Sequence, residues 1–207
     1  MMNTERIIEI ISSAQGRQIV VASKYIDASQ IKELSKLGLH DFGENRTDAL
    51  LKKCEIIGED TDIHFHFIGH LQSNKAKLIA NKICCLHSLD SIKTARILND
   101  VRDNPLDCFV ELHLTDNDAK SGVMEADLPA FLKALEPFQN IRVIGFMAMS
   151  DKQMSDDEKR EVFHRAKLLA EHYGFSQLSM GMSDDYLLAI QEGATTLRLG
   201  RIITDNC

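Results

Sequence analysis

The stretch SMGMSDDYLLAIQEGATTLRLGR, residues 179–201, combines the residue types that bind a phosphate group. It predicts a small polar turn before a helix, followed by a strand that ends in Arg-Leu-Gly-Arg. Backbone N–H groups at such a helix start have no partner within the helix, and the helix dipole favours an anion there. Each charge-assisted hydrogen bond contributes roughly 1.5–3 kcal/mol. Together with the hydroxyl of Ser183, these donors predict a site for a small phosphorylated ligand.

Lys24 closes the apolar run VVASK, so its amine is expected at the end of a strand, in the mouth of the fold. A low-dielectric mouth disfavours the charged ammonium and favours the neutral, nucleophilic amine. Such an amine can condense with an aldehyde, and a phosphorylated cofactor that carries an aldehyde would use both Lys24 and the phosphate site. The alternative interpretation is an ordinary surface lysine at a strand end.

Three histidines, His64, His66 and His70, have the spacing of one face of a strand. An HxH pair at a barrel mouth can bind zinc in metal-dependent hydrolases, which makes such a hydrolase one alternative. No set of carboxylate ligands accompanies the three residues. We therefore expect histidines that are satisfied by hydrogen bonds in the core or at the rim, and no metal site.

The chain as a whole alternates short apolar, β-branched runs with segments of helical period. Capping boxes are expected at Asp27 with Gln30 and at Ser155 with Glu158. The predicted strands are residues 19–23, 39–43, 63–69, 83–89, 107–114, 141–147, 177–181 and 195–200. Eight such units, with strands too apolar to have a wet face, predict an α/β fold, a closed (β/α)8 TIM-type barrel. An open doubly wound sheet is the alternative, although no GxGxxG follows the first strand.

In parallel barrels the reactive side chains gather at the carboxyl ends of the strands. The polar residues that follow the predicted strands are therefore expected on one rim, together with the phosphate site after the seventh and eighth strands. These residues are Lys24, Glu44, Asn45, His70, Gln72, Ser88, Asp90, Lys120 and Ser150.

The composition favours one domain, residues 1–207, that binds a small molecule: 44% of the chain is hydrophobic and no long linker divides it. The net charge of −7, without a basic block, argues against nucleic acid and anionic membranes as partners. The first residues predict an amphipathic helix and no signal peptide, and no apolar run reaches membrane-spanning length. Five cysteines without a CxxC pattern indicate a reducing compartment, so we expect a cytoplasmic protein.

The motifs VASKY, FGENR, HFIGHLQSNK, SLD, GFMAMS and SMGMSDDYLLAIQEGATTLRLG occur in this order along the chain. In order and spacing they resemble the pyridoxal phosphate homeostasis protein family, from about Ile19 to Ile203. The resemblance implies the barrel of the alanine racemase N-terminal domain, with an extra N-terminal helix and without the second, β-rich domain of the racemases. It also implies pyridoxal 5′-phosphate (PLP) as the cofactor.

The resemblance carries over to individual positions. Lys24 matches the lysine that holds PLP as an aldimine, and Asn45 matches a residue that lines the cofactor. Ser183, Gly200 and the backbone of Arg201 match phosphate-binding positions. The family often has a small hydroxyl residue at position 201, so we expect the Arg201 side chain either to point elsewhere or to contact the phosphate.

Arg198 matches the arginine that faces the pyridine nitrogen of the cofactor. A charged guanidinium there disfavours protonation of the ring, so the cofactor becomes a weaker electron sink. A racemase also needs a second proton-transfer group, and none of Tyr25, Tyr173 and Tyr186 lies in a motif that would supply one. The resemblance therefore implies a monomeric protein that binds PLP and serves its homeostasis, with PLP-requiring apo-enzymes as partners. A small PLP-dependent amino-acid racemase or lyase is the alternative.

Overall fold

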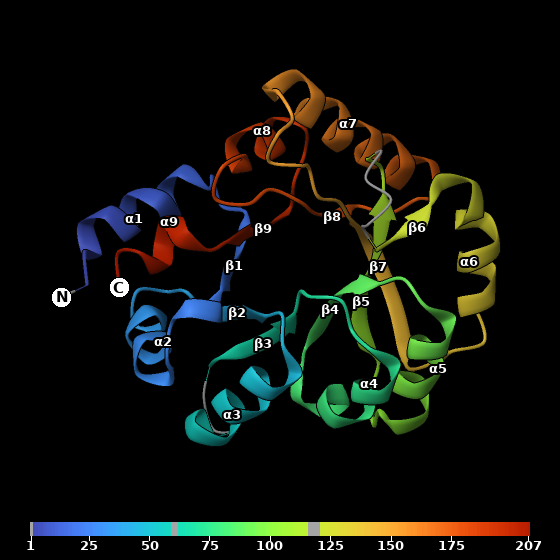
Figure 1. Cartoon of the computed structure of the whole chain (residues 1–207), viewed down its shortest axis with the longest axis horizontal. Coiled ribbons are helices and arrows are strands. Elements are labelled where there is room, and N and C mark those ends of the chain that lie inside the picture. Colours follow the sequence, from blue (N-terminus) through green and yellow to red (C-terminus); the bar gives the residue numbers. More distant parts are fainter. Residues whose placement is uncertain (1, 59–61, 116–120) are drawn as a thin grey trace.

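The computed structural model describes residues 2–58, 62–115 and 121–207. Its strands form a closed parallel barrel (Figure 1). The wall runs in the order β1, β2, β3, β4, β5, β7, β8 and β9, and the β4–β5 and β1–β9 pairings close it. These strands are β1 (Gln18–Ala22), β2 (Asp41–Glu44), β3 (His64–Phe67), β4 (Cys85–Leu89), β5 (Leu106–His113), β7 (Ile141–Met147), β8 (Gln177–Ser179) and β9 (Thr196–Leu199). The predicted eight-stranded barrel is confirmed, and the open sheet was the wrong alternative.

Helices cover the outside of the barrel (Figure 1). They are α1 (Thr4–Ser13), α2 (Ala28–Ser35), α3 (Thr47–Ile57), α4 (Ser73–Ile79), α5 (Ile92–Val101), α6 (Leu128–Leu135), α7 (Asp156–His172), α8 (Tyr186–Gln191) and α9 (Arg201–Thr204). Short 3₁₀ turns occur at η1 (Ser23–Tyr25), η2 (Ala80–Lys82) and η3 (Glu125–Asp127). The predicted N-terminal helix is α1, which buries Ile7 and Ile10 and packs beside α9.

The strands explain why this chain forms a barrel. Every residue of β4 and of β9 is buried, so neither strand offers a face to water. Parallel strands with two buried faces need cover on both sides, which a filled barrel and its ring of helices provide. Both predicted capping boxes are present, at the starts of α2 and α7. No helix in the described ranges is long and apolar enough to cross a membrane.

Two short elements had not been predicted. Strand β6 (Val123–Met124) pairs with the end of β5, and helix α9 follows β9 directly. Elements of two and four residues are too short to show a period of 2 or 3.6, so hydrophobic patterns do not reveal them. Lys24 also lies in the 3₁₀ turn η1 and not in the first strand, which ends at Ala22.

Candidate functional site

A pocket of about 830 Å³ opens at the carboxyl ends of the barrel strands. The lining residues include the six cofactor positions that the sequence singled out, Lys24, Asn45, Ser183, Arg198, Gly200 and Arg201. His70 and Ser150, which were predicted at the rim, line it as well. Lys120 lies outside the described residues. The tertiary structure thus brings a lysine, an arginine and the predicted phosphate-binding positions together in one pocket.

Three other predicted rim residues, Gln72, Ser88 and Asp90, lie close to this pocket. Gln72 lines a smaller neighbouring pocket of about 400 Å³. Ser88 Oγ donates to the carbonyl oxygen of Gly69 at 2.5 Å, and the Asp90 carboxylate lies 3.3 Å from His70 Nδ1. These contacts order the loops at the barrel mouth.

Ser183 lies against the turn that follows β9, which contains the other two predicted phosphate-binding positions, Gly200 and Arg201. Ser183 Oγ accepts from the backbone N–H of Gly200 at 3.2 Å and from that of Ile202 at 3.3 Å, so the donors belong to the turn between β9 and α9. At the start of α8, the backbone N–H groups of Asp185 and Tyr186 already donate to the carbonyl oxygen of Met182. In the ligand-free protein the two N–H groups donate to the Ser183 hydroxyl, and together these three groups form a cluster, the Ser183 cradle, of the kind that binds a phosphate.

Arg201 begins α9, and its side chain lies beside Asp184 at the pocket. Its guanidinium lies 3.5 Å from the carboxylate of Asp184, and both side chains are exposed. Asp184 directly follows Ser183, and both expectations for the Arg201 side chain stay predictions.

Lys24 is exposed at the edge of the pocket, with its ammonium 4.9 Å from the ring centre of Tyr25. Tyr25 itself is 68% exposed. The expectation of an enclosed, low-dielectric surrounding was therefore wrong for the free protein. Because the strand ends at Ala22, the turn η1 carries the lysine past the barrel wall to the rim.

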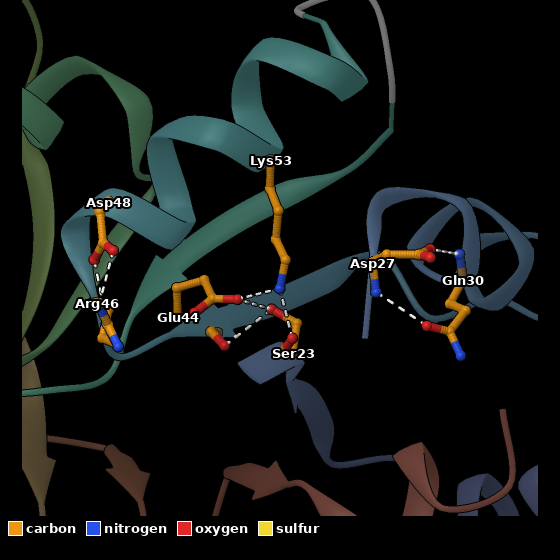
Figure 2. Close-up of polar contacts among 8 residues, drawn as sticks. Ser23, Asp27, Gln30, Glu44, Arg46, Asp48 and Lys53 are labelled. Carbon is orange, nitrogen blue, oxygen red and sulfur yellow. Dashed lines mark hydrogen bonds and ion pairs between the residues drawn. The ribbon is translucent and has the colours of Figure 1, made fainter. Parts of the chain in front are cut away.

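A buried ion pair holds the turn that carries Lys24 (Figure 2). Glu44, at the end of β2, is fully buried and forms an ion pair with Lys53 of α3. Ser23 Oγ donates to the same carboxylate at 2.8 Å, and Lys53 Nζ donates to the carbonyl oxygen of Ser23 at 2.5 Å. Glu44 thus lies within the barrel wall and not on the rim, where it had been predicted. It positions the residue before Lys24.

Sequence reasoning missed Lys53, although a signal was present. Leu50, Lys53 and Ile57 lie at i, i+3 and i+7 of α3, and all three are buried. A lysine in the apolar stripe of a helix needs a buried partner, because an isolated charge is costly to remove from water. Glu44 is that partner. In contrast, Arg46 pairs with Asp48 on the surface of the same helix start (Figure 2).

Arg198 forms part of the pocket lining and is 4% exposed. Its Nη1 donates to the carbonyl oxygen of Ser179 at 2.7 Å and to Ser179 Oγ at 2.6 Å, and Nη2 donates to Ala148 O at 3.1 Å. Burial lowers the pKa of the guanidinium to about 10, while Asp185 and Glu111 oppose the shift. The side chain therefore keeps its charge at neutral pH.

Glu111 of β5 is a second residue that sequence reasoning missed. It is 2% exposed, lines the pocket, and accepts a hydrogen bond from Ser121 Oγ at 2.8 Å. Burial raises the pKa of this carboxyl group, and the hydrogen bond from Ser121 opposes the shift. The available signal was a carboxylate within the apolar run DCFVELHL. Glu111 thus adds a buried carboxyl group to the pocket lining.

The structure does not bring the three histidines of the predicted metal alternative together. The side chains of His64 and His70 are 58% and 57% exposed, whereas His66 is buried beside His87 and Cys85. The facing nitrogens of His66 and His87 are 2.9 Å apart, which is a hydrogen-bond distance. The two ligand nitrogens of imidazoles that bind one tetrahedral zinc ion lie roughly 3.3 Å apart. Zinc binding would therefore require His66 and His87 to move apart.

The barrel and its pocket define a known class of protein. The family described as alanine racemase, N-terminal domain, matches residues 4–205. A pyridoxal phosphate homeostasis protein of Pseudomonas aeruginosa is 37% identical over 188 residues, which cover 88% of this chain and 81% of that protein. A pyridoxal phosphate homeostasis protein of Escherichia coli is 32% identical over 195 residues, 89% of this chain and 83% of that one. The chain belongs to this family of pyridoxal phosphate homeostasis proteins, as its motifs predicted.

Solved structures agree with this assignment. PipY of Synechococcus elongatus, solved with PLP bound, is 29% identical and has a TM-score of 0.87, covering 97% of this chain and 98% of its own. PipY without PLP has a TM-score of 0.91 with the same identity and coverage. Alanine racemase from Corynebacterium glutamicum shares the fold, with a TM-score of 0.72 at 15% identity, over 97% of this chain and 59% of its own.

Proposed function

We propose that this protein binds PLP in the barrel-mouth pocket and serves intracellular PLP homeostasis. The observation that carries the proposal is the convergence of Lys24, Arg198 and the Ser183 cradle on one pocket, in a chain similar to PipY, whose structure holds PLP. In this proposal the phosphate accepts from the N–H groups around Ser183 and Gly200, and the Lys24 amine condenses with the aldehyde to form a Schiff base. Asn45 lines the ring.

Arg198 favours holding PLP over turning over a substrate. PLP supplies an electron sink whose strength depends on protonation of its ring nitrogen. We propose that the Arg198 guanidinium faces this nitrogen. Because it is charged at neutral pH and held by Ser179 and Ala148, it disfavours a second positive charge beside it. A weak electron sink suits storage and delivery.

An amino-acid racemase or lyase is the second candidate function, and Glu111 is the observation that favours it. β5 lies four strands from β1 in both directions around the barrel, so Glu111 lies across the mouth from the Lys24 side. Burial raises the pKa of its carboxyl group, as expected of a residue that exchanges protons. A racemase needs such a group opposite the lysine.

We further propose that the protein acts as a monomer in the cytoplasm and passes PLP to apo-enzymes. Its five cysteines are all free, which suits a reducing compartment. The exposed position of Lys24 and Tyr25 at the pocket edge suits transfer, because the Schiff base would be accessible.

The proposal is tested by titrating the purified protein with PLP and recording absorbance spectra, followed by borohydride reduction and mass spectrometry. We expect a reducible adduct on Lys24. Lys24→Ala should remove the adduct and retain weaker binding through the phosphate. Lys152→Ala is the matched control, because Lys152 lines the same pocket. An adduct that maps to another lysine, or one that survives Lys24→Ala, would contradict the proposal.

A second assay separates the two candidate functions. The holoprotein is incubated with single enantiomers of amino acids, and the products are resolved by chirality and mass. Homeostasis predicts no sustained turnover. Stereospecific turnover that disappears in Glu111→Gln would instead support the racemase or lyase.

A further inference from the structure

A continuous chain of hydrogen-bonded side chains crosses the inside of the barrel. His66 Nε2 lies 2.9 Å from Asp41 Oδ1, and His66 Nδ1 lies 2.9 Å from His87 Nε2. His87 Nδ1 lies 2.7 Å from Ser179 Oγ, which accepts from Arg198 Nη1 at 2.6 Å. The chain connects the amino end of β2, where Asp41 lies, with the pocket that Arg198 lines.

The two ends of this chain differ in what they can offer. A guanidinium only donates, and a carboxylate only accepts. Burial alone would raise the pKa of Asp41, but the side-chain hydrogen bonds from His66 and Gln18 oppose burial, and the pKa lies below its ordinary value. Asp41 is therefore a carboxylate at neutral pH, and Arg198 is charged.

These ends give the chain a direction. Arg198 donates to Ser179 Oγ, whose proton is then free for His87 Nδ1. His87 consequently carries its proton on Nε2 and donates to His66 Nδ1, and His66 donates from Nε2 to Asp41. In this arrangement both imidazoles are neutral and every donor meets an acceptor.

The competing arrangement is less favourable. If His66 were protonated on both nitrogens, His87 would have to donate to Ser179 Oγ, and the hydroxyl proton of Ser179 would lose His87 as its acceptor. A doubly protonated His66 would also place a second cation, besides Arg198, inside the barrel. Burial, together with His66 and Arg198, holds the pKa of His87 well below its usual range, so His87 is neutral in either case.

We propose that Asp41, His66, His87 and Ser179 are positioning residues, which hold the Arg198 guanidinium in one orientation toward the ring of the bound cofactor. The inference rests on the proposed function. All three groups between the ends are buried: His66 is 3% exposed, and His87 and Ser179 are fully buried. In such surroundings hydrogen bonds polarise one another, so the Asp41 charge acts on Arg198 through the chain.

The first test uses the ligand-free protein and does not depend on PLP. Nitrogen-15 NMR of histidine-labelled protein at neutral pH distinguishes the two tautomers and the imidazolium. We expect His66 and His87 to be neutral and protonated on Nε2. A doubly protonated His66, or a proton on Nδ1 of His87, would overturn the proposed direction of the chain.

The second test measures PLP affinity and the absorbance maximum of the bound cofactor. Ser179→Ala interrupts the chain beside Arg198, and Asp41→Ala removes its far end. We expect each to weaken PLP binding about tenfold, as expected when one hydrogen bond of this kind is lost, and to shift the maximum. Ser179→Thr keeps a hydroxyl and should restore both readouts. His64→Gln is the control, because exposed His64 lies 3.6 Å from the same Asp41 carboxylate but outside the chain.

The outcomes separate the two proposals. If the wild-type protein does not bind PLP, both the proposed function and the positioning role are wrong. The NMR spectrum of the ligand-free protein still determines the direction of the hydrogen-bonded chain. If the wild type binds PLP and both variants match it in affinity and spectrum, the positioning role is wrong. Circular dichroism establishes that each variant is folded. Asp41 is partly exposed, so Asp41→Ala is the substitution expected to disturb folding least.

Discussion

Lys53 of α3 forms an ion pair with the fully buried carboxylate of Glu44 at the end of β2. The same ammonium donates to the backbone of Ser23, one residue before Lys24. A helix on the outside of the barrel is thereby linked to the turn that presents the proposed Schiff-base lysine. Stability and cofactor binding are therefore expected to depend on one contact.

Replacing Lys53 with Met should strongly destabilise the protein. The substitution leaves the Glu44 carboxylate buried without its cation, which costs about 3–5 kcal/mol. Urea unfolding measures the loss. Lys52→Met, at an exposed position of the same helix, should change the free energy of unfolding by less than about 0.5 kcal/mol. Adding Glu44→Gln to Lys53→Met should recover part of the stability; no recovery would show that the buried charge is not the cause.

Replacing Glu111 with Gln should change how stability depends on pH. Because burial raises the pKa of Glu111, the folded protein retains this proton to a higher pH than the unfolded chain. The free energy of unfolding therefore falls as the pH rises from the ordinary value of 4.5 through the folded pKa. Glu111→Gln keeps an acceptor for Ser121 and should remove this loss. Urea unfolding between pH 4 and pH 8 measures how the free energy of unfolding depends on pH. Glu136→Gln, at an exposed position, is the control. The same pH dependence in the wild type and both variants would contradict the prediction.

Replacing Ser183 with Ala should weaken the binding of PLP but not of pyridoxal. The hydroxyl bridges the N–H groups of Gly200 and Ile202 in the proposed phosphate cradle. Loss of one hydrogen bond to a charged group predicts an affinity about tenfold lower. Titrations with both vitamers measure it by absorbance. An equal loss of affinity for pyridoxal, which has no phosphate, would show that Ser183 does not act through the phosphate.

Replacing Gly69 with Ala should disturb the pocket through Asn45. A Cβ atom at position 69 would lie 2.6 Å from the carbonyl oxygen of Asn45 and 2.7 Å from its Cα, so the backbone of Asn45 must move. Forcing an extra methyl group into a packed site costs about 1–3 kcal/mol. Urea unfolding and PLP titration should both report a loss. Unchanged PLP affinity in the folded variant would argue against a role for Asn45 in binding.

Some features of this protein follow from local sequence. The apolar runs, the capping boxes at Asp27 and Ser155, and the count of eight strands predict the barrel, because hydrophobic period and capping depend on neighbouring residues. The positions of Lys24, Asn45 and Ser183 after the first, second and seventh predicted strands then predict one shared pocket, because parallel strands end on the same side.

Other features were decided only by the tertiary structure. The pairing of Glu44 with Lys53 and the path from Asp41 through His66, His87 and Ser179 join residues on separate elements, so no spacing along the chain reveals these partners. Lys24 was expected to be desolvated but is exposed, because the exact end of β1 depends on its pairing with β2 and β9. Sequence period determines which elements form and roughly where they end, whereas burial and charge pairing arise from contacts between elements.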